Sequence, residues 1–398
     1  MTSVSTISLS KGRDRSLRRR HPWVYSGAIA GIDGDPAPGD VVRVVDHENT
    51  FLAWAYFNRH SKIQARVLDW NEAASIDGSW WQRRVSEAIE RRRGLPGLEE
   101  TNVYRLIHAE ADGLPGLIAD RYGDFIVVQA LAAGVERVKD TVRDALLDAV
   151  GPKGIFERSD QEFRKLEGLG PSTGLLAGEA PPDRVEIVEK GRRFFVDITG
   201  GQKTGFYIDQ RDNRALLAEH ARGKEVLDLF AYTGAFSVYA LLAGAARATL
   251  VESSHGALEI AEANLAANGI DPEGVELIQG NVFEVARSFR DSGRRFDLVI
   301  ADPPKFAQSR GQLEGAERAY KDVNLLAMKL LAPGGILATF SCSGAVEIEH
   351  FSRIIAWAGV DANRHVQILR RLSQGADHPV VPTFPESEYL KGLICRVV

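Results

Sequence analysis

The fold is decided by the stretch Glu225-Val-Leu-Asp-Leu-Phe-Ala-Tyr-Thr-Gly-Ala-Phe236. It predicts a short apolar strand, a tight turn, and an apolar helix that runs through about Gly244. In that order these elements place a ligand site at the carboxyl end of a parallel strand. Gly234 has no Cβ, so the backbone N–H groups of the turn can approach a ligand closely. Asp228 ends the strand and can accept hydrogen bonds from a ligand amine.

Four further strands follow, and each ends in or runs into a residue that a site can use. They cover residues 248–252, 275–279 (followed by Gly280-Asn281), 296–302 (followed by Pro303-Pro-Lys-Phe306) and 335–340 (followed by Ser341-Cys-Ser343). A carboxylate at Glu252 can hold both hydroxyls of a ribose. Strands that alternate with helices predict a mostly parallel sheet covered on both faces, which is an α/β fold.

The spacing of these strands resembles that of class I S-adenosylmethionine-dependent methyltransferases. A dinucleotide dehydrogenase is the nearest alternative. That class requires Gly-x-Gly-x-x-Gly at the first turn, where this chain has Ala-Tyr-Thr-Gly-Ala-Phe.

Length and composition limit the other classes of protein. A chain of 398 residues predicts two or three domains, and its 44% hydrophobic and 26% charged residues are typical of a globular protein. The net charge of −5 excludes an all-round polycation but allows a local basic face. Cys342 and Cys395 are too few for a disulfide framework or a four-ligand zinc site, so we expect a reducing cytoplasm and no metal. No run of about 18 apolar residues predicts a membrane span.

The N-terminal segment is basic and aromatic. Residues 11–20 carry six cations and one acid, and His21-Pro-Trp-Val-Tyr25 follows. Cations neutralise phosphates and aromatic rings stack on bases, so an RNA-binding surface is one interpretation. Its candidate residues are Lys11, Arg13, Arg18, Arg19, Arg20 and Trp23. The alternative is a solvated run of charges beside a structural tryptophan.

The chain divides into three predicted units. Residues 1–75 form a small β-rich domain with strands near 40–45, 51–56 and 63–68. Residues 76–183 form an α+β domain with helices at 80–93 and 135–150 and strands between and after them. In this domain residues 170–183, rich in Gly and Pro, are expected to be a linker or turn. Residues 184–398 form the α/β domain, with a helix at 346–357 and closing strands at 365–371 and 389–397.

These motifs together resemble the large-subunit (23S) ribosomal RNA cytosine-C5 methyltransferase I family over essentially the whole chain. The resemblance is carried by residues 11–13, 20–27, 111–117, 203–211, 228–234, 302–306 and 341–343. It implies an N-terminal PUA-type RNA-binding domain, a central α+β domain and a Rossmann-like methyltransferase domain. It also implies a seven-stranded sheet whose last strand is antiparallel, S-adenosylmethionine as the cofactor and ribosomal RNA as the partner.

The chemistry implied is attack by a thiolate on C6 of cytosine, which makes C5 nucleophilic. Cys342 is the predicted nucleophile because it follows a central strand, and Cys395 is expected in the core. Asp302 is predicted to bind the cytosine amino group or protonated N3, and also to line the cofactor site. Lys305 is a candidate for activating the thiol and for binding RNA.

The remaining cofactor contacts are assigned by position. Glu252 is expected to bind the ribose and Asn281 the adenine edge, where many methyltransferases have an aspartate. Residues 203–211 are expected to close over the methionine end, so the predicted cofactor-binding set is Asp228, Phe230, Gly234, Glu252, Asn281, Asp302, Lys203 and Arg211.

Two other functions remain open at this point. Asp302-Pro-Pro304 also occurs in enzymes that methylate amines, so methylation of a purine nitrogen without a covalent adduct is one. A non-catalytic RNA-binding or assembly protein is the other. Related enzymes often have a second cysteine where this chain has Pro304-Lys305, which leaves open the base that removes the C5 proton. The oligomeric state is also open, with a homodimer as one alternative.

Overall fold

The structure is a computed structural model, and it describes residues 4–160, 163–306 and 310–398. Its chain forms two compact units, and neither is continuous in sequence. The first consists of Met1–Lys190, Asp197–Phe206 and Ala376–Ser387. The second consists of Gly191–Val196, Tyr207–Gly375 and Glu388–Val398.

The first unit begins with a six-stranded sheet in the order β2-β6-β5-β4-β1-β3. Its elements are β1 (Thr6–Leu9), α1 (Arg15–Arg18), β2 (Trp23–Tyr25), β3 (Ile29–Asp33), β4 (Val41–Val45), β5 (Phe51–Phe57) and β6 (Ile63–Asp69). Alternate residues such as Val42 and Val44 are buried, because side chains on a strand point to opposite faces. The three strands expected from the sequence are β4, β5 and β6.

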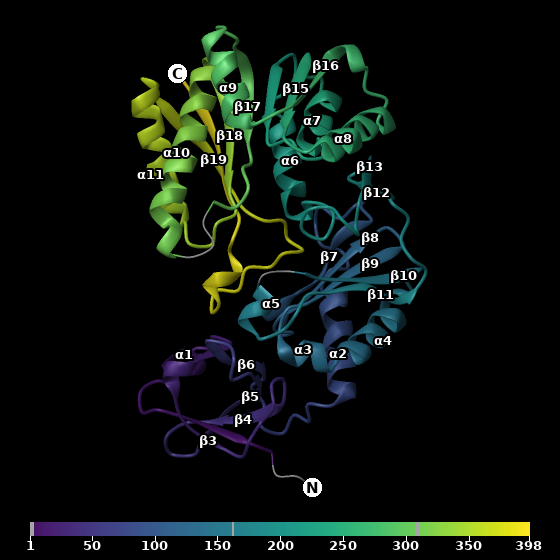
Figure 1. The fold of residues 1–398 in the computed structure, drawn as a ribbon, viewed down its shortest axis with the longest axis vertical. Coiled ribbons are helices and arrows are strands. Elements are labelled where there is room, and N and C mark those ends of the chain that lie inside the picture. The colour runs from purple at the N-terminus through teal and green to yellow at the C-terminus, as the bar shows by residue number, and fades with distance from the viewer. Residues whose placement is uncertain (1–3, 161–162, 307–309) are drawn as a thin grey trace. The chain divides into compact units, whose positions relative to one another are not determined.

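A five-stranded sheet in the order β11-β10-β9-β8-β7 completes most of the first unit. The elements of this part of the chain are α2 (Gly78–Glu90), β7 (Val103–His108), β8 (Leu117–Tyr122), β9 (Phe125–Ala130), α3 (Ala133–Arg137), α4 (Lys139–Val150), β10 (Gly154–Ser159), α5 (Phe163–Leu166) and β11 (Ser172–Gly178). The strand β12 (Val185–Glu189) follows them and lies outside the five-stranded sheet. Figure 1 shows α2, α3 and α4 gathered on one side of this sheet. Asp77 caps α2 by accepting a hydrogen bond from the N–H of Trp80 at 3.0 Å.

Two sequence predictions for this region were wrong. The expected linker at 170–183 contains the edge strand β11, which pairs antiparallel with β10. An edge strand tolerates the glycines that suggested a turn, because only one side of it is hydrogen-bonded. The expected helix at 135–150 is interrupted at Val138, whose φ of −109° and ψ of 14° end α3 before α4 begins.

The second unit is a seven-stranded sheet with helices on both faces (Figure 1). The strand β13 (Arg192–Val196) belongs to this unit but lies outside the seven-stranded sheet. The other elements are α6 (Arg211–Ala218), β14 (Glu225–Leu229), α7 (Ala235–Leu242), β15 (Arg247–Glu252), α8 (His255–Ala267), β16 (Val275–Gln279), α9 (Val282–Asp291), β17 (Phe296–Ala301), α10 (Leu313–Leu330), β18 (Leu331–Ser341), α11 (Ile348–Ala362), β19 (Val366–Leu372) and β20 (Lys391–Val397). The order across the sheet is β16-β15-β14-β17-β18-β20-β19.

The predicted antiparallel last strand is confirmed. β14 to β18 are parallel, and β20 runs antiparallel between β18 and β19. Alternation along the strands sorts the core into two layers: Leu227 and Leu229 pack with α9, α10 and α11, whereas Val226 packs with α6, α7 and α8. Cys395 is fully buried in the first of these layers, as expected.

A substitution at Gly392 tests this packing. A Cβ on Gly392 would lie 2.6 Å from the ring of Phe340 on β18. We expect Gly392→Ala to lower the free energy of unfolding by about 1–3 kcal/mol, because the ring has to move within a packed core. The control is Gly256→Ala in α8, where an added Cβ meets nothing within 4 Å. Urea unfolding should show a lower midpoint for the first variant alone, and equal midpoints would contradict the packing.

Candidate active site

The candidate site lies along the carboxyl edge of the second unit's sheet. The register places Leu229 beside Val251 and Ala301, and Ala301 beside Thr339. The segments that follow these strand ends therefore meet at one edge. They are the turn after β14, the end of β15, the segment after β17 and the segment after β18.

The turn after β14 is held in a backbone conformation that few residues adopt. Phe230, Tyr232 and Gly234 have φ values of 64°, 48° and 74°. Left-handed non-glycine residues cost about 1–3 kcal/mol each and often occur at ligand sites. A Cβ on Gly234 would lie 3.0 Å from Leu250 and 3.1 Å from Ala261. The glycine is thus needed for the left-handed turn and for its packing, which adds to the reason given from the sequence.

Asp228 is buried inside the sheet beneath this turn. It is 1% exposed and accepts a hydrogen bond from Ser237 Oγ of α7 at 2.7 Å. Burial, with a smaller contribution from the negative charge of Asp302, raises the pKa of Asp228 to about 7, although the Ser237 hydrogen bond opposes this. A buried carboxyl with that pKa is suited to a cationic ligand, which would stabilise its charged form.

Glu252, at the end of β15, shapes the turn as well as the edge. Its Oε1 accepts hydrogen bonds from Ser253 N, Ser253 Oγ and Ser254 N at 2.8–3.0 Å. Its Oε2 accepts one hydrogen bond, from the N–H of Tyr232 at 3.0 Å. A carboxylate oxygen can accept more than one bond, so Oε2 can also accept a ribose hydroxyl.

Asn281 is the N-cap of α9. Its Oδ1 accepts hydrogen bonds from the N–H groups of Phe283 and Glu284, at 2.9 and 3.4 Å. The helix cap thus already uses this oxygen as an acceptor of two hydrogen bonds. The amide nitrogen of Asn281 is therefore its remaining group for a ligand. Phe230 packs edge-on against Phe283 at 6.3 Å between ring centroids, beside the same cap.

Asp302 is half-buried and accepts a hydrogen bond from Gln210 Nε2 at 2.9 Å. Gln210 is buried, and its Oε1 accepts a hydrogen bond from Asn213 at 2.6 Å. Arg211, the first residue of α6, is fully buried, with 3.6 Å between its Nε and Asp212 Oδ1. Gln210 was not predicted as a site residue, although it lies in the glycine-rich loop that was.

Cys342 is half-buried between two fully buried serines, Ser341 and Ser343. Ser343 Oγ lies 2.9 Å from the hydroxyl of Tyr320, which is buried on α10. Tyr207 packs edge-on against Tyr232 of the turn, at 5.5 Å between ring centroids. Burial raises the pKa of Tyr207, and negative charges on Asp302 and Cys342 add to that shift. The tyrosine is thus close enough to both predicted catalytic groups to sense their charge.

The predicted cations lie in different places. Lys305 is exposed three residues after Asp302. Lys203 has a φ of 51° in a turn of the first compact unit, so its role at the cofactor stays a prediction.

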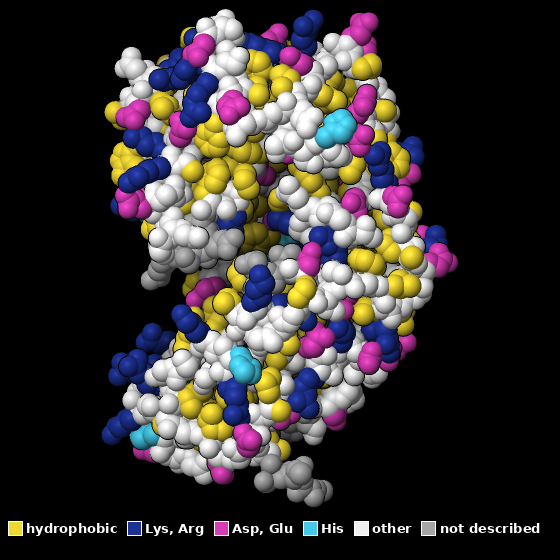
Figure 2. Space-filling view, in the orientation of Figure 1, with side chains coloured by type: hydrophobic (Ala, Val, Ile, Leu, Met, Phe, Trp, Pro, Cys, Tyr) yellow, Lys and Arg dark blue, Asp and Glu magenta, His cyan; other side chains and the backbone are white. Residues whose placement is uncertain are grey.

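The basic N-terminal segment belongs to the first unit. Figure 2 shows Lys and Arg side chains gathered around the place that α1 occupies in Figure 1. Lys11, Arg13 and Arg19 are exposed. Arg18 is ion-paired with both Asp14 and Asp46, and Arg20 lies over the ring of Trp70 at 4.9 Å.

Trp23 is more enclosed than a base-stacking residue needs to be. Its Nε1 donates to Glu110 at 2.8 Å, and its ring packs against Phe384 at 4.7 Å and beneath Arg66 at 5.5 Å. These contacts favour the structural interpretation of Trp23.

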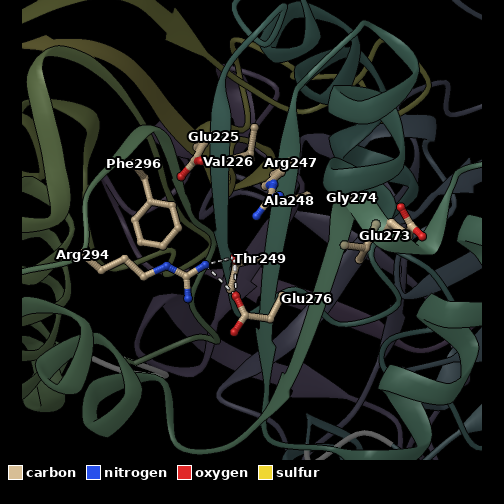
Figure 3. Close-up of a pocket in the computed structure, with 11 residues that line it drawn as sticks. Glu225, Val226, Arg247, Ala248, Thr249, Glu273, Gly274, Glu276, Arg294 and Phe296 are labelled. Carbon is tan, nitrogen blue, oxygen red and sulfur yellow. Dashed lines mark hydrogen bonds and ion pairs between the residues drawn. The ribbon is translucent and has the colours of Figure 1, made fainter. Parts of the chain in front are cut away.

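A separate pocket lies at the opposite, amino edge of the same sheet. Figure 3 shows Arg294 directed toward Thr249 and Glu276, and its Nη2 donates to them at 2.8 and 2.6 Å. The pocket has a volume of about 510 Å³ and is lined by residues at the starts of β14, β15, β16 and β17. None of the predicted site residues lines it.

Two absences hold for the described residues. No group of three or more His, Cys, Asp or Glu side chains in residues 4–160, 163–306 and 310–398 is arranged to hold a metal ion. Within the same ranges, no helix is long and apolar enough to cross a membrane.

Known proteins resemble this chain in sequence and in fold. A family model described as a PUA-like domain matches residues 7–70, and one described as an S-adenosylmethionine-dependent methyltransferase matches residues 170–386. The ribosomal RNA large subunit methyltransferase I of Erwinia tasmaniensis is 45% identical over 392 residues, which cover 98% of this chain and 99% of that protein.

Two solved structures show the fold. The methyltransferase SMU.776, solved with SAH, has a TM-score of 0.86 at 23% identity and covers 99% of this chain and 100% of its own. A tRNA m1G methyltransferase of M. jannaschii has a TM-score of 0.51 at 17% identity and covers 84% of this chain and 82% of its own.

The seven-stranded sheet and the family match define an S-adenosylmethionine-dependent methyltransferase with a PUA-like domain near its amino end. The site fits that cofactor: Asp228 is a buried acid suited to a cation, Glu252 Oε2 can accept a hydroxyl, and the buried Thr233 hydroxyl of the turn has no hydrogen-bond partner among the described residues. The 45% identity over nearly the whole chain shows the particular family. The chain belongs to the ribosomal RNA large subunit methyltransferase I family, as the sequence motifs indicated.

The pKa of Asp228 predicts a pH dependence of stability. The folded carboxyl keeps its proton up to about pH 7, whereas its ordinary pKa is 3.8. Its contribution to stability is therefore fully present below about pH 4 and is lost as the pH rises through 7. The Asp228→Asn variant has no carboxyl to titrate at this position. The melting temperature of the ligand-free variant minus that of the wild type should therefore increase between pH 4.5 and 8. The gain corresponds to at most about 1.4 kcal/mol per pH unit, and a constant difference would argue against a raised pKa.

Proposed function

We propose that the chain transfers a methyl group from S-adenosylmethionine to C5 of a cytosine in large-subunit ribosomal RNA, through a covalent adduct between Cys342 and C6. The observation that carries the proposal is the placement of a half-buried thiol on the same sheet edge as Asp302 and the left-handed turn. The name of the 45% identical relative supports large-subunit ribosomal RNA as the substrate.

The chemistry begins at the sulfur. The Cys342 thiolate adds to C6, and the electron pair of the C5–C6 bond becomes available at C5. S-adenosylmethionine, when bound, supplies the methyl group that C5 accepts. Loss of the C5 proton then restores the double bond and expels the sulfur as a thiolate.

Asp302 is suited to orient the base. Its carboxylate is fixed by Gln210 on one side, and Pro303 and Pro304 restrict the backbone that follows it. A carboxylate held in this way can accept a hydrogen bond from the cytosine amino group or from protonated N3, where positive charge develops in the adduct.

The cofactor is assigned to the β14 and β15 side of the edge. We assign Asp228, the turn from Phe230 to Gly234, Lys203 and Arg211 to its methionine part. Glu252 Oε2 accepts from the ribose, and the amide nitrogen of Asn281 donates to the adenine edge. In this arrangement residues 1–75 bind RNA, residues 76–183 form the central domain and residues 184–398 carry the chemistry.

Methylation of a purine nitrogen is the second candidate. The specific observation for it is Asp302-Pro303-Pro304, a motif that also serves enzymes without a catalytic thiol. The tRNA m1G methyltransferase shares the fold, so the fold does not select the base. The position of Cys342 favours C5 methylation.

Replacing the thiol tests the covalent route. Cys342→Ala should lower methyl transfer by more than roughly 1,000-fold, because it removes the thiol that adds to C6. Its affinity for S-adenosylmethionine, measured by calorimetry, should be unchanged. Cys395→Ala is the matched control: it removes the other thiol, which is fully buried in the core, and should retain methyl transfer. Mass spectrometry of nucleosides from the modified RNA should show 5-methylcytidine; full activity of Cys342→Ala, or an N-methylated purine, would contradict the proposal.

RNA binding by the N-terminal segment is tested by comparing arginines in different environments. The double variant Arg13→Ala/Arg19→Ala removes two exposed charges. It should weaken RNA binding and make the dependence of log K on log salt shallower by about 1.5–2, because two phosphate contacts are lost. Arg18→Ala is the control, since Arg18 already pairs with Asp14 and Asp46 and should have a smaller effect. An unchanged salt dependence in the double variant would exclude this surface.

A further inference from the structure

Lys391, the first residue of β20, is a lysine inside the core. It is 5% exposed, and the strand that follows it, from Gly392 to Cys395, is fully buried. Its Nζ donates to two backbone carbonyl oxygens, those of Ser343 and Tyr389, both at 3.1 Å. Among the described residues, no carboxylate lies within ion-pair distance of this ammonium.

The antiparallel direction of β20 explains why a lysine reaches this place. Ser341, the last residue of β18, pairs with Lys391, the first residue of β20. The amino end of β20 therefore lies at the carboxyl edge of the parallel strands. From there the Lys391 side chain extends along the segment that follows β18 and reaches the carbonyl of Ser343, the residue directly after Cys342.

A buried ammonium without an anion is costly, because carbonyl dipoles replace only part of its hydration. The groups that act on Lys391 electrostatically are Glu388, Cys342, Lys305 and Glu347. Tyr320 on α10 also senses Cys342, and Tyr207 senses both Cys342 and Asp302. Lys305, Glu347 and Glu388 are all exposed, so water screens their charges.

We propose that Lys391 is the cation that stabilises the Cys342 thiolate, and that it is a positioning residue which acts through this sulfur. The inference rests on the proposed function, because it assigns the source of the nucleophile. The thiol releases its proton to solvent, and the thiolate that remains is stabilised by the nearby Lys391 ammonium. When the sulfur is expelled at the end of the reaction it leaves as a thiolate again, so the pair is restored and the C5 proton departs by another route.

The titration of Lys391 agrees with this geometry. Burial lowers the pKa of the Lys391 ammonium, and the negative charges of Glu388 and, to a smaller extent, Cys342 act in the opposite direction. Burial therefore makes Lys391 easier to deprotonate than a lysine in water, whereas a thiolate at Cys342 favours the charged amine. The two groups thus stabilise each other's charge, which is the arrangement that a neighbouring cation provides to reactive cysteines in general.

The test measures the thiol directly, in the full chain without cofactor or RNA. The rate at which iodoacetamide alkylates Cys342 is followed against pH by mass spectrometry of the peptide that contains it. In Lys391→Met the midpoint of this profile should rise by about one pH unit or more, which leaves roughly tenfold less thiolate at pH 7. Lys391→Arg keeps the charge, so the midpoint of its profile should lie close to that of the wild type. A midpoint in Lys391→Met equal to that of the wild type would overturn the proposal.

Two controls separate a loss of charge from a loss of structure. Lys224→Met removes an exposed lysine before β14, at the opposite edge of the sheet, and should leave the midpoint unchanged. Cys395 is fully buried and should stay unmodified in every folded variant. If Lys391→Met exposes Cys395, the comparison is made with Lys391→Gln, which keeps a polar group at the two carbonyls; an unshifted midpoint there also overturns the proposal.

The readout distinguishes this inference from the proposed function. A shifted midpoint together with an N-methylated purine as the RNA product would support the Lys391–Cys342 pairing and contradict methylation at C5. An unshifted midpoint together with 5-methylcytidine would contradict the Lys391–Cys342 pairing and support methylation at C5. In the second case another group activates Cys342.

Discussion

The hydrogen bonding between β14, β17, β18 and β20 is the constraint on which the site depends. It brings a turn, a carboxylate, a thiol and an ammonium to one edge, although they lie far apart along the chain. A one-residue slip in any pairing would turn a strand's side chains to the other face. The two packed layers of the core oppose such a slip, because they require Leu227 and Leu229 on one face and Val226 on the other.

This edge separates charges of opposite sign. Asp228, Glu252 and Asp302 lie at the ends of β14, β15 and β17, where a cofactor with a sulfonium and an ammonium would find complementary charge. Lys391, and Lys305 on the surface, lie on the side of β18 and β20 that carries the thiol. Burial, with a smaller contribution from the negative charge of Asp302, raises the pKa of Asp228, so a bound cation would stabilise its charged form. The ends of β14, β15 and β17 are thus suited to a positively charged ligand, and the side of β18 and β20 is suited to a thiolate.

The sequence predicted the strands of this sheet well, for a physical reason. Buried parallel strands are mostly apolar runs bounded by turn residues, so the expected strand at 296–302 coincides with β17 to within one residue. The strand β11 was missed because glycines at a sheet edge resemble a turn. Gln210 was missed as a site residue because its partner, Asp302, is 92 residues away and no local pattern links them. Lys391 did leave a signal, a charged residue directly before the apolar run Gly392-Leu-Ile-Cys395. Asn281 left another, an asparagine three residues before Glu284 at a helix start.

The loop between β19 and β20 has a consequence for how the molecule is built. Residues Ala376–Ser387 belong to the first compact unit, where Asp377 Oδ2 accepts from the N–H of Arg105 and its carbonyl accepts from buried Arg92. A fragment that stops before the methyltransferase strands would lack this segment and would leave those buried donors unsatisfied. The polypeptide passes back and forth between the two bodies, so neither can be completed until almost the whole chain has been synthesised.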